Sequence, residues 1–384
     1  MKIIYAVESV NLPGGYDRII IEKANYLAEH GQDVIISVAS HALAKPYYPI
    51  SDKVRLVDFN INFHQQYGHN LLFRTCLYFI LMRKYRKALK DLLYIEHPDI
   101  VITTLGREID FITELHDGSV KIGESHIAKD YVRNLHLMEQ RGFVYRMIAN
   151  YWRKKIDGKV KKLSALVLLT QHDANSWEGL TKTVVIPNSL PFYPPHGSPC
   201  ENKQVIFVGR LNEQKGLEYL IDTWTKVNRK HPDWMLHMYG DGEQKQSLSQ
   251  MIKETGLEHV VIVHQPTSMI MEKYLESSAF LLTSRFEGLP MVLIEALACG
   301  LPVVSFDCPW GPADIIRDGE DGFLVDYLNT DKAAQRVCQL IENPILRKNM
   351  GIKARINCQR YNRDVVMKQW TDLFEILRNQ KSSK

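Results

Sequence analysis

Short apolar segments alternate with longer amphipathic segments along the whole chain. The short segments are rich in β-branched residues, as are strands of a parallel sheet that is covered on both faces. They lie at 3–7, 34–38, 100–104, 120–124 and 166–170, and again, after residue 203, at 205–208, 235–239, 260–263, 280–283 and 303–306. Helical spacing of apolar residues falls between and after them, for example at 16–30, 137–163 and 362–378. This alternation, which occurs twice, predicts an α/β protein with two doubly wound, Rossmann-like domains.

A proline-rich stretch marks the boundary between the two domains. Residues 187–203 contain five prolines and read as an extended connection. We therefore expect an N-terminal domain at 1–190, a linker at 191–203 and a C-terminal domain at 204–361. The helix within 362–384 could pack back on the first domain. Two such domains would face a cleft, with ligands bound beyond the carboxyl ends of the strands.

The composition narrows the class of protein. The chain has 384 residues, 45% hydrophobic and 24% charged, which excludes a disordered chain. Its longest apolar run, 76–82, is far shorter than the about 20 residues that cross a bilayer. Six cysteines lie apart with no C-x-x-C pair, which is typical of reduced thiols and not of a disulfide scaffold or a zinc site. These features predict a cytoplasmic protein.

The net charge of +4 is unevenly distributed. Its excess lies in 71–90, which has no acidic residue, and in 141–163, which has Asp157 alone. Both segments mix bulky apolar residues with cations at helical spacing, as helices on an anionic membrane surface do. Two core-facing helices with a solvated basic side would show the same pattern. No nucleic-acid-binding motif accompanies these cations, so nucleic acid is not an expected partner.

Two carboxylates stand out in the second domain. Glu287 lies in the loop after the predicted strand 280–283, and Pro290 suits the first turn of a helix that carries Glu295 in its second turn. Gly288 lets the backbone approach a ligand, and free amides at the helix start suit phosphate. A carboxylate near a phosphate site usually accepts hydrogen bonds from sugar hydroxyls. Alternatively, Glu295 caps its own helix or forms a salt bridge within it.

Two cations occupy the loop after the first strand of the second domain. Arg210 and Lys215 stand five positions apart, where they could converge on one diphosphate. Arginine supplies a planar fork and lysine a point charge. The simpler alternative is a solvated Lys215 and an Arg210 paired with Glu213.

Taken together, these segments resemble the retaining glycosyltransferases of family 4, which have the GT-B fold. The family's E-x7-E pair matches Glu287 and Glu295, and its GRL-x3-KG motif matches residues 209–216. Weaker matches lie at 14–15, 186–188, 240–242, 298–304 and 319–325. The resemblance spans essentially the whole chain and is strongest over 203–330.

The resemblance implies a role for each matching residue. Arg210 and Lys215 would bind the diphosphate of a nucleotide sugar, Glu295 the ribose and Glu287 the transferred sugar. The backbone of Gly14 and Gly15, in the first domain, would approach the same group. The implied donor site comprises Gly14, Gly15, Arg210, Lys215, Gly240, His264, Gln265, Glu287, Gly288, Leu289, Pro290, Met291 and Glu295. No metal or other cofactor is implied, which fits the absence of an Asp-x-Asp motif.

Two further segments bear on the substrates. His126 follows the predicted strand 120–124 and resembles the family's histidine that faces the donor sugar, which makes it the fourth catalytic candidate beside Glu287, Arg210 and Lys215. It could instead only fix its own loop. His264 and Gln265 stand where the family often has glycine beside the nucleobase. Residues 307–312 resemble members that use UDP-sugars, which favours uridine.

The predicted activity is the retaining transfer of a hexose or N-acetylhexosamine from a nucleotide diphosphate sugar to a hydroxyl of a growing glycan in surface polysaccharide biosynthesis. An oligosaccharide or lipid-linked glycan is the expected acceptor, at the cytoplasmic face of the inner membrane. Retention of the anomeric configuration could result from cleavage that the departing diphosphate assists. It could also result from a mechanism with a covalent intermediate. Two alternatives are an inactive nucleotide-sugar-binding subunit and a nucleotide-sugar epimerase of the same architecture.

Overall fold

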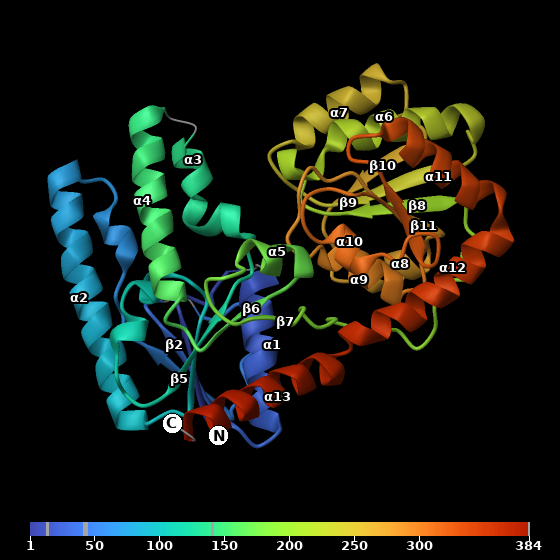
Figure 1. Cartoon of the computed structure of the whole chain (residues 1–384). Coiled ribbons are helices and arrows are strands. Elements are labelled where there is room, and N and C mark those ends of the chain that lie inside the picture. The colour runs from blue at the N-terminus through green and yellow to red at the C-terminus, as the bar shows by residue number, and fades with distance from the viewer. Residues whose placement is uncertain (13–14, 41–44, 140–141, 383–384) are drawn as a thin grey trace. The chain divides into compact units, whose positions relative to one another are not determined.

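The structure is a computed structural model that describes residues 1–12, 15–40, 45–139 and 142–382. The chain forms two compact units (Figure 1). The first comprises Met1–Ile186 together with Met367–Lys384, and the second comprises Pro187–Val366.

The first unit is built on a parallel sheet of seven strands in the order β3-β2-β1-β4-β5-β6-β7. The strands are β1 (Lys2–Val7), β2 (Asp33–Val38), β3 (Val54–Asp58), β4 (Ile100–Thr103), β5 (Val120–Glu124), β6 (Ala165–Leu168) and β7 (Thr183–Val185). The helices are α1 (Gly15–Glu29), α2 (Leu71–Glu96), α3 (Leu135–Glu139), α4 (Phe143–Val160), α5 (Gln171–Ser176) and most of α13 (Arg363–Ser382), with short 3₁₀ turns η1 (Phe63–Gln66), η2 (Arg107–Asp110), η3 (Ile112–Glu114) and η4 (Lys129–Asn134).

Helices cover both faces of this sheet. The face that carries Ile4 and Ile35 shares one apolar core with buried residues of α2 and α4. Tyr5 points to the opposite face, where Lys23 of α1 lies over its ring. Because both faces are covered, the central strands are apolar at nearly every position, as the sequence pattern indicated.

The second unit has a parallel sheet of six strands in the order β10-β9-β8-β11-β12-β13. The strands are β8 (Gln204–Val208), β9 (Met235–Tyr239), β10 (Val261–His264), β11 (Ala279–Leu282), β12 (Val303–Phe306) and β13 (Gly322–Val325). The helices are α6 (Leu217–Lys230), α7 (Lys245–Glu254), α8 (Ile270–Leu275), α9 (Met291–Ala298), α10 (Pro312–Ile315), α11 (Thr330–Glu342) and α12 (Pro344–Asn357), with 3₁₀ turns η5 (Glu213–Lys215) and η6 (Cys358–Tyr361). Two Rossmann-like parallel-sheet units confirm the predicted fold class.

Some elements differ from the sequence prediction. The single helix expected at 137–163 is two helices, α3 and α4, because Gly142 before α4 has φ 122°. The expected linker 191–203 is packed into the second unit. The Arg355 guanidinium donates to the carbonyl of Pro194 (3.0 Å), and the Ser198 amide donates to that of Cys299 (2.7 Å). Prolines therefore mark an extended strap here and not a free connection. No described helix combines the length and apolar character needed to cross a bilayer.

Candidate active site

Loops from three strands meet at the carboxyl edge of the second sheet. β8 lies between β9 and β11, so the strand order reverses beside it, and ligands bind at such switch points. The loop after β8 is held on both sides by backbone hydrogen bonds. The Leu211 amide donates to the carbonyl of Asp241 (2.9 Å), and the Arg285 amide donates to that of Gln214 (2.7 Å).

Two glycines allow these loops to lie so close together. Gly216 has φ +58°, and a Cβ there would lie 2.4 Å from the carbonyl oxygen of Thr283. A Cβ on Gly240 would lie 2.0 Å from the carbonyl oxygen of Gly209. The glycines of the sequence motifs therefore set the backbone spacing of the site.

Lys215 and Glu287 come together from different loops. Lys215 Nζ lies 2.6 Å from Glu287 Oε1, and both side chains are largely buried. The Ser284 hydroxyl donates to the same carboxylate oxygen at 2.6 Å. The interpretation of Lys215 as a solvated surface lysine is therefore wrong. A buried ion pair at a switch point presents a fixed cation and a fixed acceptor to a ligand.

Arg210 is the contrasting cation of the same loop. Its side chain is exposed and makes no hydrogen bond or ion pair with any residue that the structure describes, so the alternative pairing with Glu213 is not formed. Its guanidinium is free to bind an anion at the edge of the site.

Glu295 lies on α9, which Pro290 precedes as the N-cap. The hydroxyl of Tyr274 on α8 donates to Glu295 Oε2 at 3.1 Å. Burial and the charge of Glu295 raise the pKa of Tyr274 well above its ordinary value, which keeps this donor protonated. In the described part of the chain, no residue accepts a hydrogen bond from three amides before and at the start of α9, those of Gly288, Leu289 and Met291.

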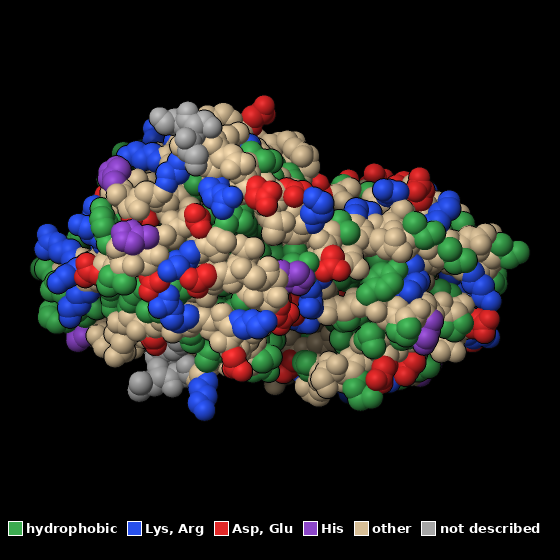
Figure 2. All heavy atoms as spheres, turned by 90° about the horizontal axis from the view of Figure 1, so that it is seen from below, with side chains coloured by type: hydrophobic (Ala, Val, Ile, Leu, Met, Phe, Trp, Pro, Cys, Tyr) green, Lys and Arg blue, Asp and Glu red, His purple; other side chains and the backbone are tan. Residues whose placement is uncertain are grey.

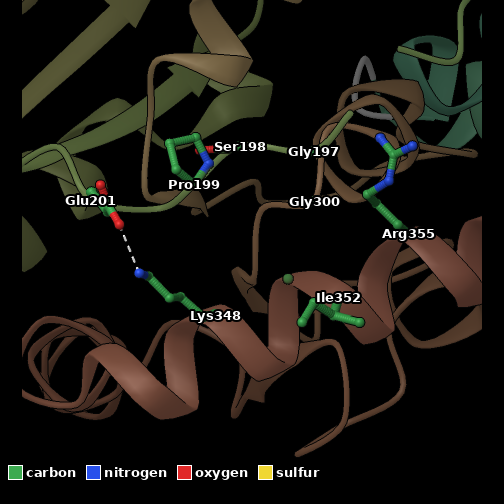
Figure 3. Close-up of a pocket in the computed structure, with 9 residues that line it drawn as sticks. Gly197, Ser198, Pro199, Glu201, Gly300, Lys348, Ile352 and Arg355 are labelled. Carbon is green, nitrogen blue, oxygen red and sulfur yellow. Dashed lines mark hydrogen bonds and ion pairs between the residues drawn. The ribbon is translucent and has the colours of Figure 1, made fainter. Parts of the chain in front are cut away.

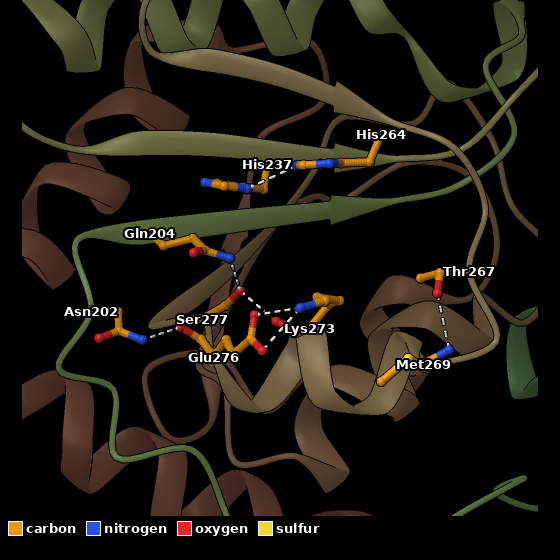
Figure 4. A network of polar contacts seen from close by, with 9 residues as sticks. All are labelled: Asn202, Gln204, His237, His264, Thr267, Met269, Lys273, Glu276 and Ser277. Atoms are coloured by element: carbon orange, nitrogen blue, oxygen red, sulfur yellow. Dashed lines mark hydrogen bonds and ion pairs between the residues drawn. The ribbon is translucent and has the colours of Figure 1, made fainter.

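Of the two residues predicted beside a nucleobase, His264 lies next to His237 of the neighbouring strand (Figure 4). His264, at the end of β10, stacks on Tyr239 with ring centroids 4.4 Å apart. His264 Nε2 lies 3.0 Å from His237 Nδ1, so His237 is a hydrogen-bonding partner and not only a packing residue. Burial and the charge of Lys273 lower the pKa of His264, which favours the neutral ring. Gln265 follows it and is exposed.

The first unit has its own cavity at the carboxyl edge of its sheet. This cavity measures about 480 Å³ and is lined by residues that include Tyr16, Thr104, His126 and Arg133. Tyr16 follows Gly15 at the start of α1, and His126 lies just after β5. Gly14 lies outside the described residues. His126 therefore faces a cavity large enough for a sugar unit.

Sequence reasoning missed the residues behind His126. Its Nε2 lies 3.0 Å from Glu124 Oε1, and Glu124 also forms a buried ion pair with Lys23. One signal for Lys23 was present, because this lysine interrupts the apolar stripe of α1 between Ile20 and Leu27.

The second unit also contains a cavity, which lies apart from the residues of the predicted donor site (Figure 3). It measures about 300 Å³ and lies between the strap at 197–201 and α12. Lys348 Nζ is paired with Glu201 at 2.7 Å, and the Arg355 guanidinium donates to the carbonyl of Pro194 at 3.0 Å. Its charged side chains therefore serve to fix the strap.

Two Rossmann-like units, one of which carries the Lys215–Glu287 ion pair at its switch point, are the architecture of GT-B proteins. The chain belongs to the family described as glycosyl transferases group 1, whose profile matches residues 193–357. Amylovoran biosynthesis glycosyltransferase AmsD of Erwinia amylovora is 30% identical over 385 residues, which cover 97% of this chain and 99% of that protein.

Solved structures show the same fold. A variant of S. aureus TarM, in complex with Fondaparinux, alpha-GlcNAc-glycerol and UDP, has a TM-score of 0.73 at 17% identity, covering 97% of this chain and 99% of that chain. The lipopolysaccharide outer core galactosyltransferase WaaB, in its apo form, has a TM-score of 0.74 at 19% identity. The match covers 97% of this chain and 98% of that chain. The predicted class, a glycosyltransferase with the GT-B fold, is confirmed.

Proposed function

We propose that this glycosyltransferase moves a hexose or N-acetylhexosamine from a UDP-sugar to a hydroxyl of a growing surface glycan, with retention, as a member of family 4. The observation that carries the proposal is the buried Lys215–Glu287 pair, together with Arg210 of the same loop, whose side chain has no partner among the described residues. AmsD is named for the biosynthesis of amylovoran, and the TarM complex contains UDP, which supports the acceptor class and the uridine.

Each group of the second unit has a defined part in this reaction. Arg210 and Lys215 stabilise the charge that builds on the departing diphosphate, and the amides before α9 add hydrogen bonds to it. Glu287 accepts from the hydroxyls of the transferred sugar, and Glu295 from those of the ribose. His126, in the first unit, hydrogen-bonds the sugar or the acceptor.

Bonds and protons balance without a cofactor. The bond from the anomeric carbon to the phosphate oxygen breaks, and a bond from that carbon to the acceptor oxygen forms on the same face. The departing phosphate oxygen takes the acceptor proton.

A panel of UDP-sugars, read by nucleotide release with and without glycan acceptors, tests the proposal. Acceptor-dependent release of UDP with an α-configured product from an α-configured donor is the expected result. Isomerised sugar without release would indicate the epimerase, and binding without turnover would indicate the inactive subunit. Either result would contradict the proposal.

Chelation of divalent cations should leave activity nearly unchanged. The cations proposed for the diphosphate are the side chains of Arg210 and Lys215, which EDTA does not remove. Initial rates of UDP release in EDTA and in Mg²⁺ provide the measurement. A collapse in EDTA that Mn²⁺ or Mg²⁺ restores would overturn this part of the mechanism.

We further propose that the acceptor is lipid-linked and that the first unit binds the cytoplasmic face of the inner membrane through 71–90 and 141–163. The first turns of α4 expose Phe143 (72%) and Val144 (66%), and α2 exposes Leu72 (82%) and Phe79 (59%). Such apolar side chains beside cations suit an anionic bilayer surface. The face in Figure 2 shows basic side chains next to hydrophobic ones along the edge of the first unit near α2.

Binding to anionic vesicles should therefore depend on the cations of α2. Arg86 pairs with Glu114 at 3.0 Å, so the change is best made at its exposed neighbours Arg83, Lys84 and Lys87. Reversal of these three to glutamate should abolish most sedimentation with anionic vesicles at low salt, because each cation contributes about 1 kcal/mol at such a surface. UDP affinity should not change.

The matched control reverses three exposed lysines of the second unit, Lys230, Lys253 and Lys353, which changes the net charge equally. Wild-type protein should bind neutral vesicles weakly and leave anionic ones at high salt. No lipid-dependent pelleting of the wild type at low salt would leave the solvated-helix interpretation standing.

A further inference from the structure

A buried row of charged and aromatic groups runs from α13 to the cavity of the first unit. Lys23 Nζ lies 4.4 Å from the centre of the Trp370 ring and forms an ion pair with Glu124. Glu124 Oε1 in turn lies 3.0 Å from His126 Nε2. The side chains of Lys23 and Glu124 are 5% and 1% exposed, so solvent does not screen this pair.

His126 is held from a second side by Tyr16. The two rings meet edge to face with centroids 5.2 Å apart, and the Tyr16 hydroxyl bonds to that of Thr104. The imidazole is thus fixed between an aromatic ring and a carboxylate, and it still lines the cavity.

The ionised form of Glu124 dominates at all physiological pH values. Burial opposes its ionisation, but the charge of Lys23, the largest of the opposing effects, helps to lower the pKa to about 2. A permanent carboxylate 3.0 Å from Nε2 favours a proton on that nitrogen, and a small rotation of the ring would align the two atoms, which lie at ion-pair distance, as a hydrogen bond. It leaves Nδ1 as the ring nitrogen that can accept a hydrogen bond from a ligand hydroxyl.

The fold alone does not require this arrangement. A buried ion pair contributes little net stability, since desolvation of both charges offsets their attraction, and apolar residues of similar size often replace such a pair without loss. The same strand provides a comparison, because Lys121 of β5 forms a buried ion pair with Asp117, and neither residue lines the cavity. The Lys23–Glu124 pair differs from it in that Glu124 contacts His126, which lines the cavity.

We propose that Lys23 and Glu124 are positioning residues for the transfer reaction. Glu124 fixes the ring orientation and the Nε2-protonated form of His126, Lys23 keeps Glu124 charged, and Trp370 excludes water from the pair. The proposal rests on the function proposed above for His126, because the group positioned must be one that contacts the sugar or the acceptor.

The test removes both charges at once, so that neither is left alone in the core. Lys23→Met combined with Glu124→Leu should lower kcat about tenfold to a hundredfold, because misplacement of a catalytic group by about 1 Å can cost that much. Affinity for UDP should stay within a factor of two, since the residues proposed to bind the diphosphate and the ribose lie in the second unit. The matched control, Lys121→Met with Asp117→Asn, should leave kcat unchanged.

A spectroscopic measurement separates positioning from packing. In ¹⁵N-labelled wild type, His126 should give a slowly exchanging Nε2–H resonance, assigned by its loss in His126→Gln. The control variant should keep this resonance, and the Lys23→Met, Glu124→Leu variant should lose it. Absence of the resonance in the wild type would overturn the proposal even if the double variant did not fold.

The two proposals fail in different ways. If the wild type shows no acceptor-dependent UDP release, the proposed function is wrong. If the wild type turns over and the Lys23→Met, Glu124→Leu variant keeps both its kcat and the Nε2–H resonance, the positioning role is wrong.

Discussion

Replacement of Lys215 by alanine is expected to lower kcat about a hundredfold, on the order of the loss of one oxyanion-stabilising donor. Lys215 Nζ is fixed 2.6 Å from Glu287 Oε1 at the switch point of the second sheet, so its charge is in place before the diphosphate departs. Arg210→Ala should have a similar effect, because Arg210 is the second cation of the same loop. Initial rates of UDP release at saturating donor measure both.

Lys203→Ala is the matched control for this prediction. Lys203 pairs with Asp233 and precedes β8 at the opposite end of the strand, where its side chain is 63% exposed. An exposed pair of this kind contributes about 0–1 kcal/mol, so turnover should not change. A protein lacking both Arg210 and Lys215 that kept kcat within a factor of two would refute the assignment of the two cations.

Substitution of Glu287 and substitution of Glu295 should impair different steps: sugar transfer in the first case and UDP binding in the second. Glu287→Gln should lower transfer about a hundredfold, since it removes both the acceptor for the sugar hydroxyls and the partner of Lys215. Affinity for free UDP should survive this change. Glu295→Gln should instead lower the affinity for UDP itself about tenfold, a typical value for the loss of one hydrogen bond to a charged group.

Titration calorimetry with UDP on both variants decides the matter, and thermal unfolding shows whether each is folded. Tyr274→Phe serves as a control, because it removes only the hydroxyl that donates to Glu295 at 3.1 Å. It should weaken UDP binding less than Glu295→Gln does. Equal losses of UDP affinity in Glu287→Gln and Glu295→Gln would contradict the division of roles.

The sequence predicted those elements whose signal is local. β9 and β12 have the predicted bounds because both are short, mostly apolar runs, and β12 is flanked by Pro302 and Asp307. β3 and β7 were missed for the opposite reason. β3 carries exposed charges at Arg55 and Asp58, and β7 has only three residues. Neither produces the continuous apolar run of a central strand.

The site was predictable as a set of residues but not as a set of contacts. Motif spacing identified Arg210, Lys215, Glu287 and Glu295 singly. The pairing of Lys215 with Glu287 joins residues 72 positions apart, and that of Lys23 with Glu124 joins residues 101 apart. Contacts of that range depend on the order of strands in the sheet. That order is decided by packing and not by local sequence.

The division of the chain has a consequence for synthesis on the ribosome. The second unit is one continuous stretch, Pro187–Val366, and it can complete its core as soon as that stretch has emerged. The first unit begins earlier and finishes later, because Met367–Lys384 belongs to it. Until that helix arrives, Lys23 lacks the ring of Trp370 that covers it. The cover over Lys23 can therefore be completed only after every residue of the second unit has been synthesised.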